Sequence, residues 1–139
     1  MEETILPRGY VLEKMKRGTL RLYRIRREEK QHIVASADCY PAEYRGERHY
    51  WLRDLKVHPD HRHQGLGRYL ISMIRQDCGG FPIRSVIDPG VEEPLLSFEE
   101  LRLFYQRCGA CVAENTLYWP ALSAPVNFCA DLGKTENSN

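Results

Sequence analysis

The feature that most constrains the fold is a change in the spacing of apolar residues at "VHPDHRHQGLGRYL", residues 57–70. Before it, "GTLRLYRIRRE", "HIVASADCY" and "YWLRDLKV" are apolar stretches joined by polar connections, which predicts an antiparallel meander over 18–57. After Gly65 the apolar residues recur at helical spacing, and "CGG" at 78–80 is a typical helix end. The sequence therefore predicts that a strand passes through a glycine turn into a helix over about 65–77.

The second half of the chain continues this alternation. "FPIRSVI" is a short strand candidate, and Ser97 with Glu100 forms a capping box that predicts a helix over about 98–107. "CVAENTLYW" and "PVNFC" are two further strand candidates, and 131–139 is a polar tail. A strand, helix and strand in succession cross over right-handedly, so the strands near 50–57 and 83–87 should be parallel neighbours.

We therefore expect one α/β (α+β) domain over 1–130, with a mixed, mostly antiparallel sheet, one parallel strand pair and flanking helices. A chain of 139 residues suits a single domain. Its formal net charge of +1 argues against a protein that binds polyanions over its whole surface. We find no signal peptide and no run of 18 apolar residues, so we expect a cytoplasmic protein without a membrane partner. The five cysteines are an odd number and are expected to be reduced thiols.

Several readings of the glycine turn are open. A Walker A loop is excluded, because Gly67 is followed by Arg68 and Tyr69 where that loop has lysine and a hydroxyl. A dinucleotide fold would use Gly65, Gly67 and the downstream Asp88, but it lacks the third glycine and follows antiparallel strands. The simplest alternative is a glycine turn that only begins a helix.

The whole pattern Val57-x-Pro59-x-x-Arg62-x-x-Gly65-x-Gly67, between a strand and a helix, resembles motif A of the GNAT acetyltransferase superfamily. The resemblance implies that the turn binds the pyrophosphate of acetyl-CoA and that the preceding strand pairs with its pantetheine arm. Glycines allow close approach to the backbone, and a helix N-terminus favours an anion. The implied acetyl-CoA-binding residues are Leu55, Lys56, Val57, Arg62, His63, Gln64, Gly65, Leu66, Gly67 and Arg68.

"LRLFYQRCG" is similar to motif B of the same family. The resemblance implies that Tyr105 is a catalytic acid for the departing CoA thiolate, although an aromatic residue on an apolar helix stripe is also typical of a core. It also implies a carboxylate base before motif A, which would be Asp54, with Glu43 and Glu47 as substitutes. An ion pair of Asp54 with Lys56 or a nearby arginine is the structural alternative. Family members commonly have other residues where this chain has Phe98 and Ala110.

Two further clusters carry less weight. His58, His61 and His63 lie in the turn without a fixed metal geometry, and Cys108 with Cys111 forms a single CxxC after a helix. We expect no metal site. The stretch 8–30 holds nine Lys or Arg against three Glu, which is typical of a solvated strand face and also fits a surface for RNA or an acidic partner.

The resemblance implies an N-acetyltransferase that transfers the acetyl group of acetyl-CoA to a primary amine of unknown identity. The alternative is a catalytically weak GNAT-like module that binds acetyl-CoA and regulates a protein partner. Family members usually have a strand and one or two helices before the meander, whereas at most 17 residues precede "GTLRLY". The acceptor site is then open, completed by a second subunit of a homodimer, or absent. Nucleic acid is not an expected partner.

Overall fold

The protein folds around one mixed sheet, in a computed structural model that describes residues 5–89 and 96–122. The elements are, in order, β1 (Tyr10–Arg17), β2 (Leu20–Arg27), β3 (Ile33–Tyr44), β4 (Glu47–Val57), the 3-10 turn η1 (Pro59–His61), α1 (Leu66–Asp77), β5 (Ile83–Val86), α2 (Phe98–Arg107), β6 (Cys111–Ala113) and β7 (Thr116–Trp119). The strand order is β1-β2-β3-β4-β5-β7-β6. Within the described residues β4 and β5 are parallel and all other neighbours are antiparallel, which confirms the predicted fold class.

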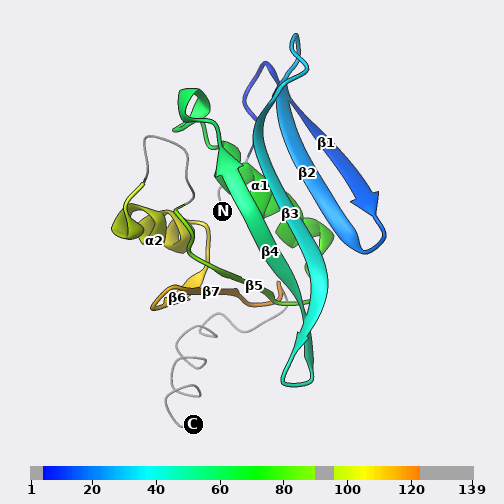
Figure 1. The fold of residues 1–139 in the computed structure, drawn as a ribbon, viewed down its shortest axis with the longest axis vertical. Helices are drawn as coiled ribbons and strands as arrows, with labels where there is room; N and C mark the ends of the chain where they lie inside the picture. The colour runs from blue at the N-terminus through cyan, green and yellow to red at the C-terminus, as the bar shows by residue number, and fades with distance from the viewer. Residues whose placement is uncertain (1–4, 90–95, 123–139) are drawn as a thin grey trace.

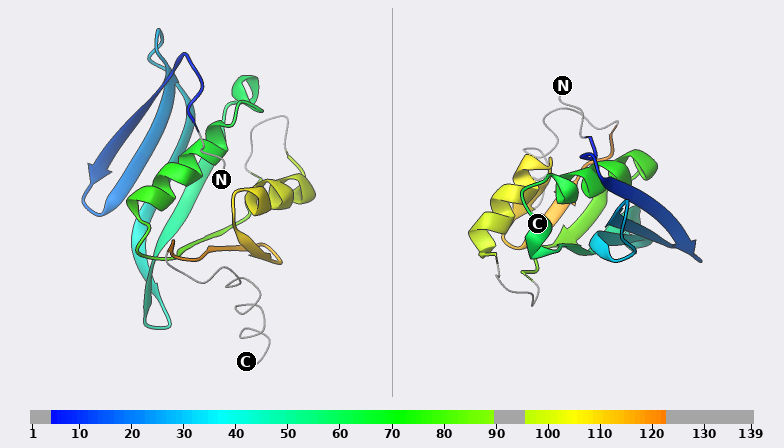
Figure 2. Two further views of the ribbon diagram at one scale, coloured as in Figure 1. Left: turned by 180° about the vertical axis from the view of Figure 1, so that it is seen from behind. Right: turned by 90° about the horizontal axis from the view of Figure 1, so that it is seen from above.

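Both helices pack on the same face of the sheet (Figures 1 and 2). The Tyr23 hydroxyl of β2 donates a hydrogen bond of 2.7 Å to Asp77 at the end of α1. The Tyr105 ring of α2 contacts the Trp119 ring of β7 at 5.9 Å between centroids. The core lies between the helices and the sheet, and its fully buried side chains include Ile25, Leu70, Ile74, Leu117 and Trp119.

Two elements differ from the sequence-based expectation. The structure adds strand β1, which the sequence did not predict because five of its eight residues are exposed and leave no apolar alternation. The segment 111–119 is a hairpin of two short strands, because Glu114 has a φ of 55° and turns the chain there. The predicted strand "PVNFC" and the polar tail lie outside the described residues.

The cysteines depart from the expectation of five reduced thiols. Cys39, Cys78 and Cys108 are free, whereas Cys111 is disulfide-bonded, so the prediction is wrong at Cys111. Because Cys108 is free, the CxxC pair is not closed on itself. In the described ranges, no helix is long and apolar enough to cross a membrane.

Candidate functional site

Strands β4 and β5 part near the middle of β4. Their register joins only Tyr50 to Ile83 and Trp51 to Arg84 among the described residues, and the Ser85 hydroxyl donates to the Leu52 carbonyl at 2.6 Å where the strands separate. Strand β4 continues to Val57 and the two strands diverge (Figure 1). Backbone groups on this edge of β4 are therefore not used by β5, and an extended ligand could pair with them.

Strand β4 also carries a bulge at Asp54. Ser36 of β3 pairs with Lys56 while Asp38 pairs with Arg53, so β4 has one residue more than β3 between these pairs. Asp54 has a φ of 54°, in the left-handed region that aspartate tolerates better than most residues. Its carboxyl group is 66% exposed and lies 3.7 Å from the Arg53 Nε atom. The ion pair with a nearby arginine is therefore present, and the carboxylate stays open to solvent.

The two substitute carboxylates lie at the other end of the strand. Glu43 pairs with Arg48, and Glu47 with Tyr44, where β3 turns into β4. The Glu47 carboxylate is 3.4 Å from Arg84 Nη2. Asp54 lies seven positions after Glu47, which is roughly 20 Å along a strand. Asp54 is thus the carboxylate of the three that lies close to the parted edge.

The segment between β4 and α1 is held by hydrogen bonds to β4 and to β1. Arg62 Nε donates to the Val57 carbonyl at 3.3 Å, and the His61 Nδ1 atom is 2.8 Å from the Tyr10 hydroxyl of β1. His63 has a φ of 65° and is exposed, as is Gln64. No group of three or more possible metal ligands occurs in the part of the chain that is described.

The N-terminus of α1 has the form of an anion site. Gly65 is its N-cap, has a φ of 80° and offers no side chain to cap the helix. The first helical hydrogen bond runs from the Tyr69 amide to the Gly65 carbonyl at 2.9 Å, so the Leu66 and Gly67 amides precede it. A Cβ on Gly65 would meet nothing within 4 Å. Such uncapped amides and the helix dipole favour a negatively charged group.

Gly67 also has a packing role at the start of α1. It is buried, and a Cβ here would lie 3.0 Å from Phe104 Cζ and 3.6 Å from Val57 Cγ2. The missing side chain therefore lets α1 pack closely against α2 and β4. Gly65 leaves open space beside its Cα atom, whereas Gly67 positions the helix against its neighbours. The sequence does not predict this contact, because the position of Phe104 on an apolar helix stripe does not reveal its packing partner.

Tyr105 lies on α2, next to this contact. Tyr105 is 6% exposed, and its ring contacts the rings of Phe104 and Trp119 edge to face. Burial, followed by the charges of Cys108 and Asp88, raises the pKa of the Tyr105 hydroxyl well above its ordinary value. The hydroxyl makes no hydrogen bond to a described residue. It is therefore a protonated donor with spare capacity.

The comparison with protein families settles the class of this chain. The family described as "Acetyltransferase (GNAT) domain" matches residues 20–109, which include the parted strands, the turn and all of α2. The chain belongs to the GNAT acetyltransferase family. The matched residues include the whole turn at 57–67. A search of curated proteins found no match.

Solved structures share this fold at low sequence identity. A GNAT-family protein from Desulfovibrio desulfuricans is 18% identical with a TM-score of 0.58, over 74% of this chain and 70% of its own. The KacTA–DNA complex is 18% identical with a TM-score of 0.59, over 86% and 76%. AtaTR bound with acetyl-CoA is 18% identical with a TM-score of 0.59, over 83% and 73%. At these identities the likeness concerns the fold.

Proposed function

We propose that the protein is an acetyl-CoA-dependent N-acetyltransferase that acetylates a primary amine. The observation that carries the proposal is the uncapped N-terminus of α1 at Gly65, placed directly after the edge of β4 that β5 leaves unpaired. The amides of this turn suit a pyrophosphate, and the free edge suits an extended arm with amide groups. AtaTR, which has the same fold, binds acetyl-CoA, and this supports the assignment.

The binding residues follow from the same geometry. Leu55, Lys56 and Val57 would present the strand edge to the pantetheine arm. The segment from Arg62 to Arg68 would hold the phosphates, with backbone amides supplied around Gly65. The Arg62 guanidinium already bonds the Val57 carbonyl, so its first role is to hold the turn against β4.

The proposed chemistry is direct attack of a neutral amine on the thioester. The ammonium form has no lone pair, so a base must accept its proton, and the exposed Asp54 carboxylate or a water beside it is the candidate. Tyr105 would stabilise the departing thiolate. Because its pKa is raised while that of a thiol is near 8.5, Tyr105 acts by donating a hydrogen bond, and full proton transfer to sulfur is unfavourable.

The test is release of CoA thiol when the purified chain is given acetyl-CoA and a panel of amines: a polyamine, an aminoglycoside and lysine peptides. Tyr105→Phe should lower kcat by about 100-fold and leave the KM for acetyl-CoA unchanged, because only the hydroxyl is lost. Asp54→Asn keeps the size and tolerates the positive φ, so it should lower activity most strongly at low pH, where the amine most needs a base. Unchanged kcat in both variants would contradict these roles.

One observation favours a second candidate, the weakly catalytic module that regulates a protein partner. Gly18 and Thr19 join β1 to β2 as a tight turn, so no helix separates these strands. Within the described residues both helices lie on one face, which leaves the other face of the sheet for a partner chain or a second copy of this one. Binding of acetyl-CoA without thiol release from any amine would favour this candidate. A cytoplasmic location and the absence of a nucleic-acid partner stay predictions.

A further inference from the structure

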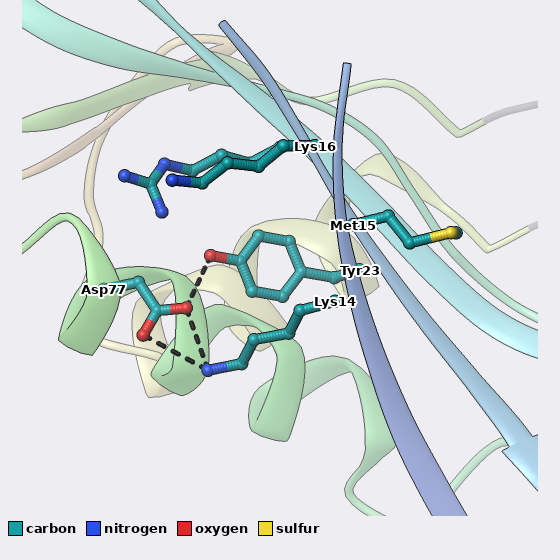
Figure 3. A pocket seen from close by; sticks show the side chains of 6 residues that line it. Lys14, Met15, Lys16, Tyr23 and Asp77 are labelled. Atoms are coloured by element: carbon teal, nitrogen blue, oxygen red, sulfur yellow. Dashed lines mark hydrogen bonds and ion pairs between the residues drawn. The ribbon is translucent and has the colours of Figure 1, made fainter. Parts of the chain in front are cut away.

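A hollow lies at the opposite end of α1 from the glycine turn. It has a volume of about 290 Å³ and is lined by Lys14, Met15, Lys16, Arg21, Tyr23 and Asp77. It lies where the end of α1 at Asp77 faces Lys14 of β1 and Tyr23 of β2. Side chains of β1 and β2 then overhang the helix end, where Lys14, Lys16 and Tyr23 converge near Asp77 (Figure 3).

The carboxylate in this hollow is already occupied. Lys14 Nζ lies 3.0 Å and 3.2 Å from the two Asp77 oxygens, and the Tyr23 hydroxyl donates to one of them at 2.7 Å. Burial raises the pKa of Tyr23, so this hydroxyl stays a donor. Lys14 also faces the negative end of the helix dipole, which completes a structural role for it.

The ion pair that explains Lys14 has no counterpart at Lys16 and Arg21. They are direct cross-strand partners on β1 and β2, and neither forms an ion pair with a carboxylate of a described residue. Like charges in such a pair destabilise the hairpin unless something offsets them. Arg21 also lies over the Tyr50 ring at 5.7 Å, which fixes its direction.

The pair of cations is reachable from two sides. A smaller cavity of about 130 Å³ is lined by Lys16, Gly18, Thr19, Arg21, Pro41 and Tyr50. It shares Lys16 and Arg21 with the larger hollow, so the two cations form a common wall. Lys16 is exposed, and its charge can therefore reach a ligand without rearrangement of the strands.

The charge count selects the ligand. Three cations and one carboxylate leave a net charge of +2, and a phosphate monoester carries about −1.5 to −2 at pH 7. We propose that this hollow binds the phosphate monoester group of a small molecule, held between Lys16 and Arg21. The site is separate from the acetyl-CoA turn, because the 12 residues of α1 span roughly 18 Å. It would let a phosphorylated metabolite act on the β1–β2 hairpin independently of acetyl-CoA.

The experiment titrates the full chain with inorganic phosphate and with glycerol phosphate, against sodium chloride of equal ionic strength, by calorimetry and by the thermal unfolding midpoint. Because phosphate can also occupy the turn at the start of α1, every titration is repeated in Gly65→Asp. Lys16→Gln should weaken binding of the monoester about tenfold through loss of one charge-assisted hydrogen bond. Arg21→Gln is the second variant, and Lys30→Gln is the control, since it removes an exposed lysine at the β2–β3 turn.

The proposal predicts saturable binding of glycerol phosphate that survives in Gly65→Asp and in Lys30→Gln and weakens in Lys16→Gln and Arg21→Gln. Binding that disappears in Gly65→Asp would place the phosphate at the glycine turn and overturn the proposal. Equal weakening in Lys16→Gln and Lys30→Gln would reduce the effect to general surface charge. Failure of the monoester to bind where inorganic phosphate binds would exclude the proposed ligand class.

Discussion

Replacing Gly67 by alanine separates the two roles that a glycine in this turn can have. The new Cβ would lie 3.0 Å from Phe104 Cζ and 3.6 Å from Val57 Cγ2, so α2 or β4 has to move. Overpacking of this kind costs about 1 to 3 kcal/mol, whereas alanine in a helix gains up to about 1 kcal/mol over glycine. We therefore expect Gly67→Ala to lower the free energy of unfolding by about 1 kcal/mol, a fall of roughly 4 °C in the midpoint.

The assay is urea and thermal unfolding of Gly67→Ala, Phe104→Leu and the double variant. If the contact is the cause, the loss from Gly67→Ala should shrink once Phe104 is shortened, and the double-mutant cycle should give a coupling of at least about 0.5 kcal/mol. Gly80→Ala is the matched control, because a Cβ on Gly80 meets nothing within 4 Å. A Gly67→Ala protein as stable as Gly80→Ala, with no coupling to Phe104, would refute the packing role.

Two further predictions concern stability. Asp38 is nearly buried on β3, and its carboxylate lies 2.7 Å from Arg24 Nη1 and 3.8 Å from Arg53 Nε. Asp38→Asn should therefore lower the free energy of unfolding, measured by urea titration, by about 2 kcal/mol. A loss no larger than that caused by Asp60→Asn, at an exposed carboxylate, would contradict this prediction. At high pH, the raised pKa values of Tyr23 and Tyr105 mean that the unfolded chain loses protons near pH 10 while the folded protein keeps them. Stability from these groups is present below about pH 10 and is lost as pH rises through their folded pKa values, so unfolding at pH 9 to 11 should show a falling midpoint that Tyr105→Phe flattens. An identical slope in Tyr105→Phe would show that this hydroxyl is not perturbed.

Local signals account for most of what the sequence predicted correctly. The capping box appears in the structure as predicted, with the Ser97 hydroxyl accepting from the Glu100 amide and the Glu100 carboxylate accepting from the Ser97 amide. The meander and α1 were predictable because apolar spacing reports directly on which face is buried. The right-handed crossover rule then placed β4 beside β5 in parallel.

The features that sequence reasoning missed depend on distant partners. Strand β1 is an edge strand with mostly exposed side chains, so its pairing with β2 leaves no periodic pattern. The bulge at Asp54 is defined by the register of β4 against β3, and no residue type in the sequence predicts it. The role of Gly67 depends on Phe104, which is 37 residues away in the chain. The hollow beside Asp77 depends on where α1 ends under the β1–β2 hairpin.

The central claim is that the turn at Gly65 holds the phosphates of acetyl-CoA, and calorimetric titration of acetyl-CoA into Gly65→Asp and Gly65→Asn tests it most directly. The two side chains match in size and both tolerate a positive φ, so they differ in charge alone. Two like charges about 5 Å apart repel by roughly 1 to 3 kcal/mol, a factor of about 5 to 150 in affinity. Gly46→Asp is the control, at a glycine with a φ of 78° and an open Cβ direction in the β3–β4 turn. The account predicts that Gly65→Asn and Gly46→Asp bind acetyl-CoA nearly as the unaltered chain does, while Gly65→Asp binds at least about fivefold more weakly. Equal affinity in Gly65→Asp and Gly65→Asn would contradict it.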